Sequence, residues 1–459
     1  MLFSSQSFLL LFLPVVLCIF YSLASVRIWR QLTLITASLV FYSSWNWKFV
    51  PILIILTLFN WLIVCQYGRT YRKIWLTFGI TFNIAVLLFF KYTNFFAANI
   101  EQLFGIPHTT WQILLPLGIS FFIFQKISYL IDLKRGATQV YKLIDFAEFV
   151  TFFPQLIAGP IVRHNEIIPQ FEINPKNPFL WENIGKGLCF ILIGLFKKVG
   201  IADSLAMTSN PLFDKALQGH ALSCMESWIA AIAYSLQIFF DFSGYSDMAI
   251  GLALLFGLSL PFNFNAPYQA KSLQEFWHRW HMTLSRFLRD YLYIPMGGNR
   301  CEFIRQNSHL LATMLIAGLW HGANWTFVAW GGLHGLGLCL NHIKKNYFSF
   351  KMPRSISWLL TLLFLIFSWV LFRSENFSTA YQIWQSMLGF HVQGTYEIKH
   401  NLIFFTAIVI ALTSPSSQTL IHTYVKPSKY IALPLGLIAA YFILLIGGRI
   451  PDAFIYFRF

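Results

Sequence analysis

The chain has 459 residues, of which 57% are hydrophobic and only 11% are charged, and its formal net charge is +15. An ordinary soluble domain has about 25% charged residues, so this composition excludes a water-soluble fold and indicates a protein dissolved in a bilayer. The basic residues form small groups between apolar runs, as at 69–73 and 344–345. This pattern is typical of cytoplasmic loops and excludes a single nucleic-acid-binding face.

Apolar segments recur along the whole chain, with no soluble domain between them. A helix that crosses a bilayer needs about 20 apolar residues, and some of these segments are shorter. We therefore predict an all-α, polytopic membrane protein with one domain over 1–459, made of N-terminal helices (1–140), a core (141–345) and C-terminal helices (346–459). The expected apolar elements lie at 7–24, 31–46, 49–66, 74–91, 113–131, 184–204, 226–257, 308–322, 325–342, 356–372, 402–414 and 431–447.

Neither the start of the chain nor its cysteines indicate a secreted, disulfide-bonded protein. The apolar stretch 8–21 has no basic region before it and no clear cleavage site, so we expect a retained first span. The six cysteines show no C-x-x-C spacing, which argues against a disulfide framework and a zinc ribbon.

The segment 145–163 is apolar but is interrupted by Pro154, Gly159 and Pro160. Proline removes a backbone donor and ends helices, and unpaired backbone survives at membrane depth only where protein or a wet cavity covers it. Two interpretations stay open here, namely a re-entrant or cavity-lining element and an ordinary kinked span.

A polar island interrupts the apolar segment 226–257. Asp241 and Tyr245, and likewise Ser243 and Asp247, have the i,i+4 spacing of helix neighbours. Carboxylates are costly in hydrocarbon, so we favour a hydrogen-bonded brace in the wall of an active site. Its expected basic partners are Arg286 or Arg289. An acid/base dyad of the two aspartates is disfavoured, because residues six apart lie on different sides of a helix.

The segment 272–294 predicts one amphipathic helix that lies at an interface and does not span the membrane. Ser272 and Glu275 match a capping box, and apolar residues then recur at helical spacing until Pro295. The opposite arc holds His278 and His281 with several arginines. Arginine suits phosphate recognition, so the ligand could be a nucleotide thioester, a phosphopantetheine arm or lipid headgroups. The phosphate-binding candidates are Arg279, Arg286, Arg289 and Arg300.

The polar side of this helix also contains three residues whose spacing is weakly typical of metal ligands. Glu275, His278 and His281 follow one another at intervals of three, but no further ligand is evident. We therefore expect no metal site.

His321 lies inside an apolar stretch, where ionisable groups are costly and usually face a bundle interior or a wet cavity. Histidine is suited to proton transfer near neutral pH, and Gly318 and Gly322 would let another backbone or a substrate approach. Asn324, three residues further on, could orient the ring if the helix continues. The residues alone do not decide whether His321 has a functional or a purely structural role. For His334, they favour a structural role.

Four long stretches, with their order and spacing, carry a resemblance to a known family. The chain resembles the membrane-bound O-acyltransferases (MBOAT), in particular the membrane subunits of alginate O-acetyltransferases (AlgI-like). The stretches are FFPQLIAGPIVR at 152–163, DFSGYSDMAIGLALLFG at 241–257, PFNFNAPYQAKSLQEFWHRWHMTLSRFLRDYLYIPMGGNR at 261–300 and GLWHGANWTFVAWGGLHG at 318–335.

The resemblance implies a fold and a site. The fold would be about eleven transmembrane helices around a thinned centre with a funnel or tunnel, plus re-entrant and interfacial helices. His321 matches the catalytic histidine of the family and His281 its second conserved histidine, whereas residue 278 is His where relatives often have Arg. The remaining matches, of less settled role, are Trp320, Asn324, Asp241, Arg289 and Asp290, with Tyr245 and Asp247 in the same wall.

The resemblance also implies a chemistry. The donor would be acetyl-CoA or another acyl thioester, with no bound cofactor. The acetyl group would cross a bacterial inner (cytoplasmic) membrane for O-acetylation of alginate, a similar exopolysaccharide or peptidoglycan. Partners would be an extracytoplasmic (periplasmic) acetyltransferase and the polysaccharide synthesis machinery. His321 would be either a general base or the carrier of the acyl group.

Two other functions compete with this one. D-alanyl transfer to teichoic acid is chemically similar, but the motifs lie closer to the acetylating members. A transporter of lipid or polymer without chemistry is disfavoured, because no inverted repeat is evident in the sequence.

Overall fold

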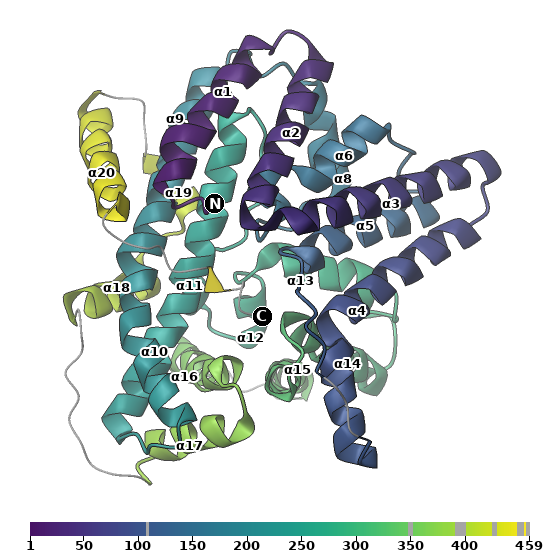
Figure 1. Ribbon diagram of the computed structural model, residues 1–459. Helices are drawn as coiled ribbons and strands as arrows, with labels where there is room; N and C mark the ends of the chain where they lie inside the picture. The colour runs from purple at the N-terminus through teal and green to yellow at the C-terminus, as the bar shows by residue number, and fades with distance from the viewer. Residues whose placement is uncertain (107–109, 348–351, 391–400, 425–428, 448–453, 456–459) are drawn as a thin grey trace. The chain divides into compact units, whose positions relative to one another are not determined.

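The computed structural model describes residues 1–106, 110–347, 352–390, 401–424, 429–447 and 454–455. Every regular element in these ranges is a helix, so the all-α prediction is confirmed for this part of the chain (Figure 1). The helices gather into two compact units. The first comprises Met1–Ile193, Tyr245–Phe262 and Val425–Ile450, and the second Gly194–Gly244, Asn263–Tyr424 and Pro451–Phe459.

The first unit contains the N-terminal helices, one C-terminal helix and parts of two long helices, α9 and α11, that also enter the second unit. With η denoting a 3-10 or π helix, its elements are η1 (Ser7–Phe12), α1 (Leu13–Ser22), α2 (Arg27–Asn46), η2 (Trp47–Phe49), α3 (Val50–Thr70), α4 (Ile74–Phe104), α5 (Ile119–Lys134), α6 (Leu143–Thr151), α7 (Phe153–Leu156), α8 (His164–Ile167), η3 (Ile168–Glu172), α20 (Lys429–Gly447), most of α9 (Leu180–Leu195) and the end of α11 (Cys224–Leu255).

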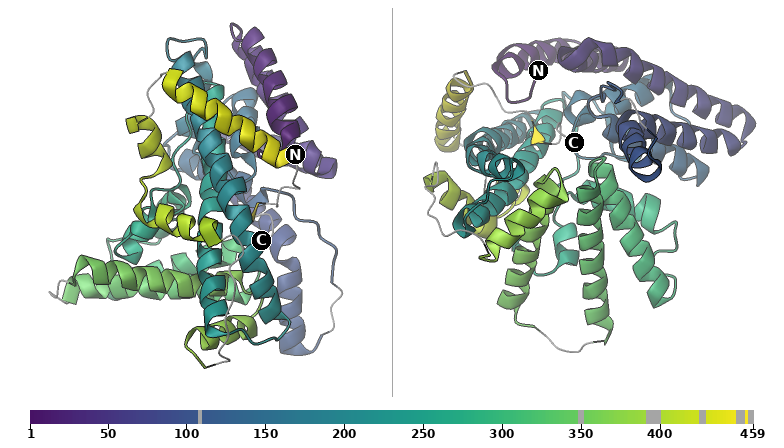
Figure 2. Two further views of the ribbon diagram at one scale, coloured as in Figure 1. Left: turned by 90° about the vertical axis from the view of Figure 1, so that its left-hand side faces the viewer. Right: turned by 60° about the horizontal axis from the view of Figure 1, so that its bottom comes forward.

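The second unit holds the remaining elements. They are η4 (Phe196–Ala202), α10 (Asp203–Leu217), η5 (Pro267–Gln269), α12 (Leu273–Trp277), α13 (Met282–Leu288), η6 (Arg289–Tyr293), α14 (Phe303–His321), α15 (Trp325–Tyr347), α16 (Arg354–Arg373), α17 (Phe377–Met387), α18 (Asn401–Thr413), α19 (Ser417–Tyr424) and the first part of α11. Figure 2 shows α14, α15 and α16 side by side, and this three-helix group carries most of the candidate site.

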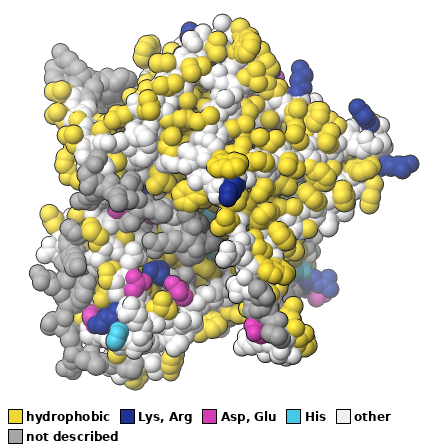
Figure 3. All heavy atoms as spheres, viewed as in Figure 1, with side chains coloured by type: hydrophobic (Ala, Val, Ile, Leu, Met, Phe, Trp, Pro, Cys, Tyr) yellow, Lys and Arg dark blue, Asp and Glu magenta, His cyan; other side chains and the backbone are white. Residues whose placement is uncertain are grey.

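The helices α3 and α4 expose an apolar surface to their surroundings (Figure 3). Ile55 is 62% exposed, Leu62 58% and Phe89 55%, which a soluble protein would bury. Lys and Arg side chains gather at the far end of this hairpin, where 69–73 joins the two helices. An apolar flank that ends in basic residues is the distribution expected of helices in a bilayer.

Fewer helices meet the criteria for a complete span than the sequence predicted. Four stretches of the described chain are long and apolar enough, and a pair bent by 72° would make a fifth. Several expected elements are too short on their own, such as the 16-residue α5 and α9. The count of about eleven spans is therefore not confirmed. The four stretches are Arg27–Thr70, Ile74–Phe104, Cys224–Leu255 and Arg354–Arg373, and the bent pair is Asn401–Thr413 with Ser417–Thr423.

The proline-split segment is a broken element covered by protein. It forms α6 and the four-residue α7, after which the chain turns and runs without regular structure up to α8. Every residue from 151 to 162 is buried. The amide of Phe153 donates to the Ser38 hydroxyl at 3.0 Å, and a Cβ at Gly118 would lie 2.7 Å from the Leu156 carbonyl oxygen. The segment is therefore an irregular element covered by protein and not an ordinary kinked span.

Candidate active site

His321 is the last residue of α14, at the turn into α15. The backbone of Gly322 is extended, with φ −164° and ψ 151°, so the helix ends there. Asn324 starts the next helix, because its Oδ1 accepts from the amide of Thr326 at 3.0 Å. Its Nδ2 donates to the Glu375 carbonyl at 2.7 Å. The expectation that Asn324 orients His321 along one helix is therefore wrong, since the two residues belong to different helices.

Two glycines bring α14 and α15 into backbone contact. A Cβ at Gly318 would lie 2.2 Å from the Phe327 carbonyl oxygen, and one at Gly331 would lie 2.3 Å from that of Met314. Only glycine permits an approach this close. The sequence left open whether Gly318 lets another backbone or a substrate approach. The structure shows the backbone of α15 at this position.

The imidazole of His321 is enclosed by aromatic rings. The side chain is buried, with 4% exposure, and its ring centroid lies 5.2 Å from those of Trp330 and Phe372, both near perpendicular to it. These aromatic rings shield the imidazole from its surroundings. Such an enclosure excludes water and strengthens electrostatic interactions inside it.

Trp320 connects the two motif histidines. Its ring centroid lies 5.0 Å from that of His321 and 6.4 Å from that of His281. The structure thus brings together three residues that the sequence selected from two separate motifs. This cluster lies entirely within the second unit.

The predicted amphipathic helix over 272–294 is broken, and His281 sits at the break. α12 ends at Trp277, and α13 starts at Met282 after His281 adopts φ 43° and ψ 53° in the left-handed region. The prediction of one continuous helix is wrong, although the cap is present, with the Ser272 hydroxyl accepting from the Glu275 amide. Because of the break, His281 leaves the polar arc and is fully buried.

The basic candidates differ in pairing and exposure. Arg279 pairs with Glu275 at 2.8 Å, and Arg289 pairs with its neighbour Asp290 at 2.6 Å. Arg286 is half-buried and also has a partner of its own, and Arg300 is exposed. The three residues of the weak metal spacing do not converge, since Glu275 is in an ion pair, His278 is exposed and His281 is buried.

The brace expected around Asp241 exists, but its cation is different. Lys198 lies 2.8 Å from Asp241 and 2.7 Å from Asp203, and Asp241 also accepts from the amide of Ile455 at 2.7 Å. The partnership with Arg286 or Arg289 is therefore wrong. Sequence analysis missed Lys198, although a lysine inside the apolar run 184–204 signals a carboxylate partner.

Tyr245 and Asp247 share the helix α11 with Asp241 but belong to the first unit, whereas Ser243 belongs to the second. Tyr245 stacks on Phe3, with centroids 4.8 Å apart, and Asp247 is buried.

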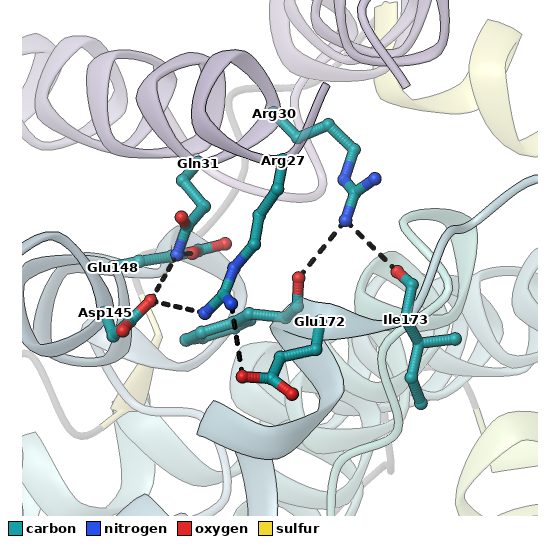
Figure 4. Close-up of polar contacts among 8 residues, drawn as sticks. Arg27, Arg30, Gln31, Asp145, Glu148, Glu172 and Ile173 are labelled. Atoms are coloured by element: carbon teal, nitrogen blue, oxygen red, sulfur yellow. Dashed lines mark hydrogen bonds and ion pairs between the residues drawn. The ribbon is translucent and has the colours of Figure 1, made fainter. Parts of the chain in front are cut away.

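A second polar cluster, in the first unit, was not predicted (Figure 4). Arg27 lies 2.7 Å from Asp145 and 3.1 Å from Glu172, and the Gln31 amide donates to Asp145 and Glu148, both at 2.8 Å. Burial raises the pKa of Glu148 to about 8. The cluster ties α2 to α6, the helix that leads into the broken element.

A third polar group follows the same element. The His164 ring lies with Nε2 3.0 Å from Asp132 and Nδ1 3.2 Å from the Tyr141 hydroxyl. The side chain of His164 is 1% exposed, so this chain of bonds satisfies a buried imidazole. It anchors the end of the segment 152–163 to the loop that follows α5.

The family follows from a comparison with known proteins. Residues 34–381 match the model of the membrane-bound O-acyltransferase family (MBOAT), and this chain belongs to that family. It is 41% identical to a peptidoglycan O-acetyltransferase of Helicobacter pylori over 424 residues, which cover 85% of this chain and 80% of the relative. It is 43% identical to a probable alginate O-acetylase, AlgI, of Azotobacter vinelandii over 400 residues, covering 85% and 78%.

A more distant similarity covers about half of the chain. A teichoic acid D-alanyltransferase of Streptococcus thermophilus is 30% identical over 233 residues, which are 49% of this chain and 56% of the relative. The protein is thus a membrane enzyme of the O-acyltransferase class, and its similarity to the acetylating relatives is greater than that to the D-alanylating one.

Proposed function

We propose that this protein passes an acetyl group from a cytoplasmic thioester, acetyl-CoA, across a bacterial inner membrane for O-acetylation of an exported polysaccharide. The single observation that carries the proposal is the 41–43% identity, over 85% of the chain, to relatives that O-acetylate peptidoglycan or alginate. The polymer would be peptidoglycan, alginate or a similar exopolysaccharide.

His321 is our candidate for the residue that handles the proton. As general base it would take the proton of an acceptor hydroxyl while the oxygen forms a bond to the thioester carbonyl carbon. The carbon–sulfur bond then breaks, and the thiolate leaves with that proton. In the alternative, the imidazole first carries the acyl group. The aromatic enclosure supports either route, because it would protect the thioester from hydrolysis.

The finer architecture also belongs to the proposal. We infer about eleven membrane helices around a thinned centre with a tunnel in which donor and acceptor meet. Arg279, Arg286, Arg289 and Arg300 are our candidates to receive the phosphates of the donor, because the planar guanidinium presents a fork of donors that matches a phosphate. An extracytoplasmic acetyltransferase and the polysaccharide synthesis machinery would be the partners that take the acetyl group onward.

D-alanyl transfer to teichoic acid is the second candidate, because one relative of this activity matches about half of the chain. The two reactions share the same step at His321 and differ in the acyl group. Supplying acetyl-CoA or a D-alanyl thioester to membranes that contain the protein would separate them, since only the true donor releases its thiol.

The catalytic assignment is tested by His321→Ala in cells that depend on this protein for polysaccharide O-acetylation. We expect the O-acetyl ester content of the polysaccharide to fall at least 100-fold, since proton transfer of this kind contributes about 10²–10⁴ in rate. His278→Ala, which alters an exposed histidine of the same unit, is the matched control and should leave the content unchanged. Unchanged acetylation in a correctly inserted His321→Ala protein would refute the proposal.

A further inference from the structure

The segment that follows α11 is bonded to the turn that carries His281. The amide of Asn265 donates to the Arg279 carbonyl at 2.9 Å, and the carbonyl of Asn263 accepts from the amide of Met282 at 3.0 Å. Asn263 is 1% exposed. These backbone bonds hold the turn in the left-handed conformation that ends α12 and starts α13.

The side chain of Asn263 receives three donors on one atom. Its Oδ1 lies 3.2 Å from the amide nitrogen of Thr283, 2.9 Å from the Thr283 hydroxyl and 3.0 Å from Nδ1 of His281. A backbone amide can only donate, so the atom that faces it must be the oxygen of the Asn263 amide and not its nitrogen.

This orientation decides the tautomer of His281. An amide oxygen can only accept, so Nδ1 of His281 must carry the proton that it shares with Asn263. In a neutral imidazole the other nitrogen, Nε2, then presents an unshared electron pair. The ring is fully buried, and burial lowers the pKa of His281 to about 3, so the neutral form prevails at physiological pH.

The electron pair of Nε2 is unused within the described part of the protein. Nε2 is buried and has no hydrogen-bond partner among the described residues. The His281 ring packs edge-to-face on Phe242, at a centroid distance of 4.7 Å, and its centroid lies 6.4 Å from that of Trp320, the neighbour of His321. Buried polar atoms are nearly always paired, so an unpaired acceptor in this cluster points to a hydrogen-bond donor that belongs to a substrate.

We infer that Asn263 is a positioning residue, which holds His281 as the Nδ1–H tautomer so that Nε2 accepts a hydrogen bond from a second hydroxyl of the acceptor, next to the one that reacts. The inference rests on the proposed acyl transfer to a polysaccharide, whose sugar units carry several hydroxyls. His281 orients the acceptor through this second hydroxyl, and His321 removes the proton of the reacting one.

The test compares three variants in membrane vesicles from cells in which the protein supports O-acetylation. Acetyl-CoA is supplied, the vesicles provide their own acceptor, and thiol release and ester formation are followed from pH 6 to pH 8. Asn263→Leu removes the acceptor of the Nδ1–H bond. Asn263→Asp keeps this acceptor but adds a negative charge. Thr283→Val removes another side-chain bond to the same oxygen and is the matched control.

Each variant has its own expected result. Asn263→Leu should lower the maximal rate at least tenfold at every pH, with the KM for acetyl-CoA within twofold of that of the native protein. The Asn263→Asp protein should have most of the native rate at pH 8, but its rate at pH 6 should be at least tenfold lower. A carboxylate beside the ring raises the pKa of His281, so that Nε2 becomes protonated as the pH falls. Thr283→Val should stay within twofold with an unchanged pH profile.

Two results would overturn the inference. One is an Asn263→Leu protein whose maximal rate stays within twofold of native, and the other is an Asn263→Asp profile that overlays the native one. A purely structural Asn263 would lower the amount of folded protein, measured by gel filtration, without shifting the pH profile. The proposed function fails separately, since it is refuted by an active His321→Ala protein whatever Asn263 does.

Discussion

At the scale of single residues, the site depends on how buried polar groups are paired. His281 is paired on one nitrogen by Asn263, and Asp241 is paired with Lys198. A buried charge without a partner is strongly destabilising, so the carboxylate of Asp241 has its cation within the fold, whereas His281 is buried as the neutral imidazole. Glu148 differs, because burial favours its neutral form although Gln31 donates to it.

Glu148 should make stability depend on pH. Its pKa in the folded protein is about 8, against 4.5 for a free side chain, so the folded state binds more protons between these values. Stability should therefore fall by on the order of 3 kcal/mol as the pH rises from 5 to 8. Glu148→Gln should remove most of this slope in thermal unfolding of the protein in detergent micelles. A slope that Glu148→Gln leaves unchanged would contradict the prediction.

At the scale of elements, the position of His321 depends on how closely α14 and α15 pack. Gly318→Ala would place a methyl group 2.2 Å from the Phe327 carbonyl oxygen, so the helices must separate. Overpacking of this kind costs about 1–3 kcal/mol, and we expect a lower Tm together with reduced acetylation.

Gly332 offers the matched control for that substitution. It lies on the partner helix α15, but an added Cβ would be 3.4 Å from the nearest side-chain atom of Leu315. Gly332→Ala should leave the Tm unchanged or raise it slightly, because alanine favours the helix. Equal effects of the two substitutions would show that the close approach of α14 and α15 is unimportant.

At the scale of the whole molecule, the apolar flanks of α3 and α4 match a lipid environment. Leu62 is 58% exposed near the middle of α3. An arginine there costs about 2.5–3.5 kcal/mol for membrane insertion, so Leu62→Arg should reduce the amount of protein in the membrane fraction. Leu62→Phe is the apolar control and should insert normally. Normal insertion of Leu62→Arg would argue that this surface faces protein or water.

The sequence by itself determined the class of the molecule and most members of the site. Composition alone indicated a protein in a bilayer. Asp241 and His321 were selected because they are ionisable residues inside apolar runs, where such a group is costly unless it has a partner or a function. The apolar segments predicted helices in the correct regions, and the four long motifs pointed to the family.

Only the tertiary structure decided how these residues are paired. The break at His281 could not be predicted from helical spacing, since it depends on hydrogen bonds that Asn263, 18 residues earlier in the chain, accepts from His281 and Met282. Lys198 as the partner of Asp241 was missed for the same reason. Helical periodicity reports which residues share a face within one segment, whereas the partner of a buried polar group is chosen by segments that meet only when the chain folds.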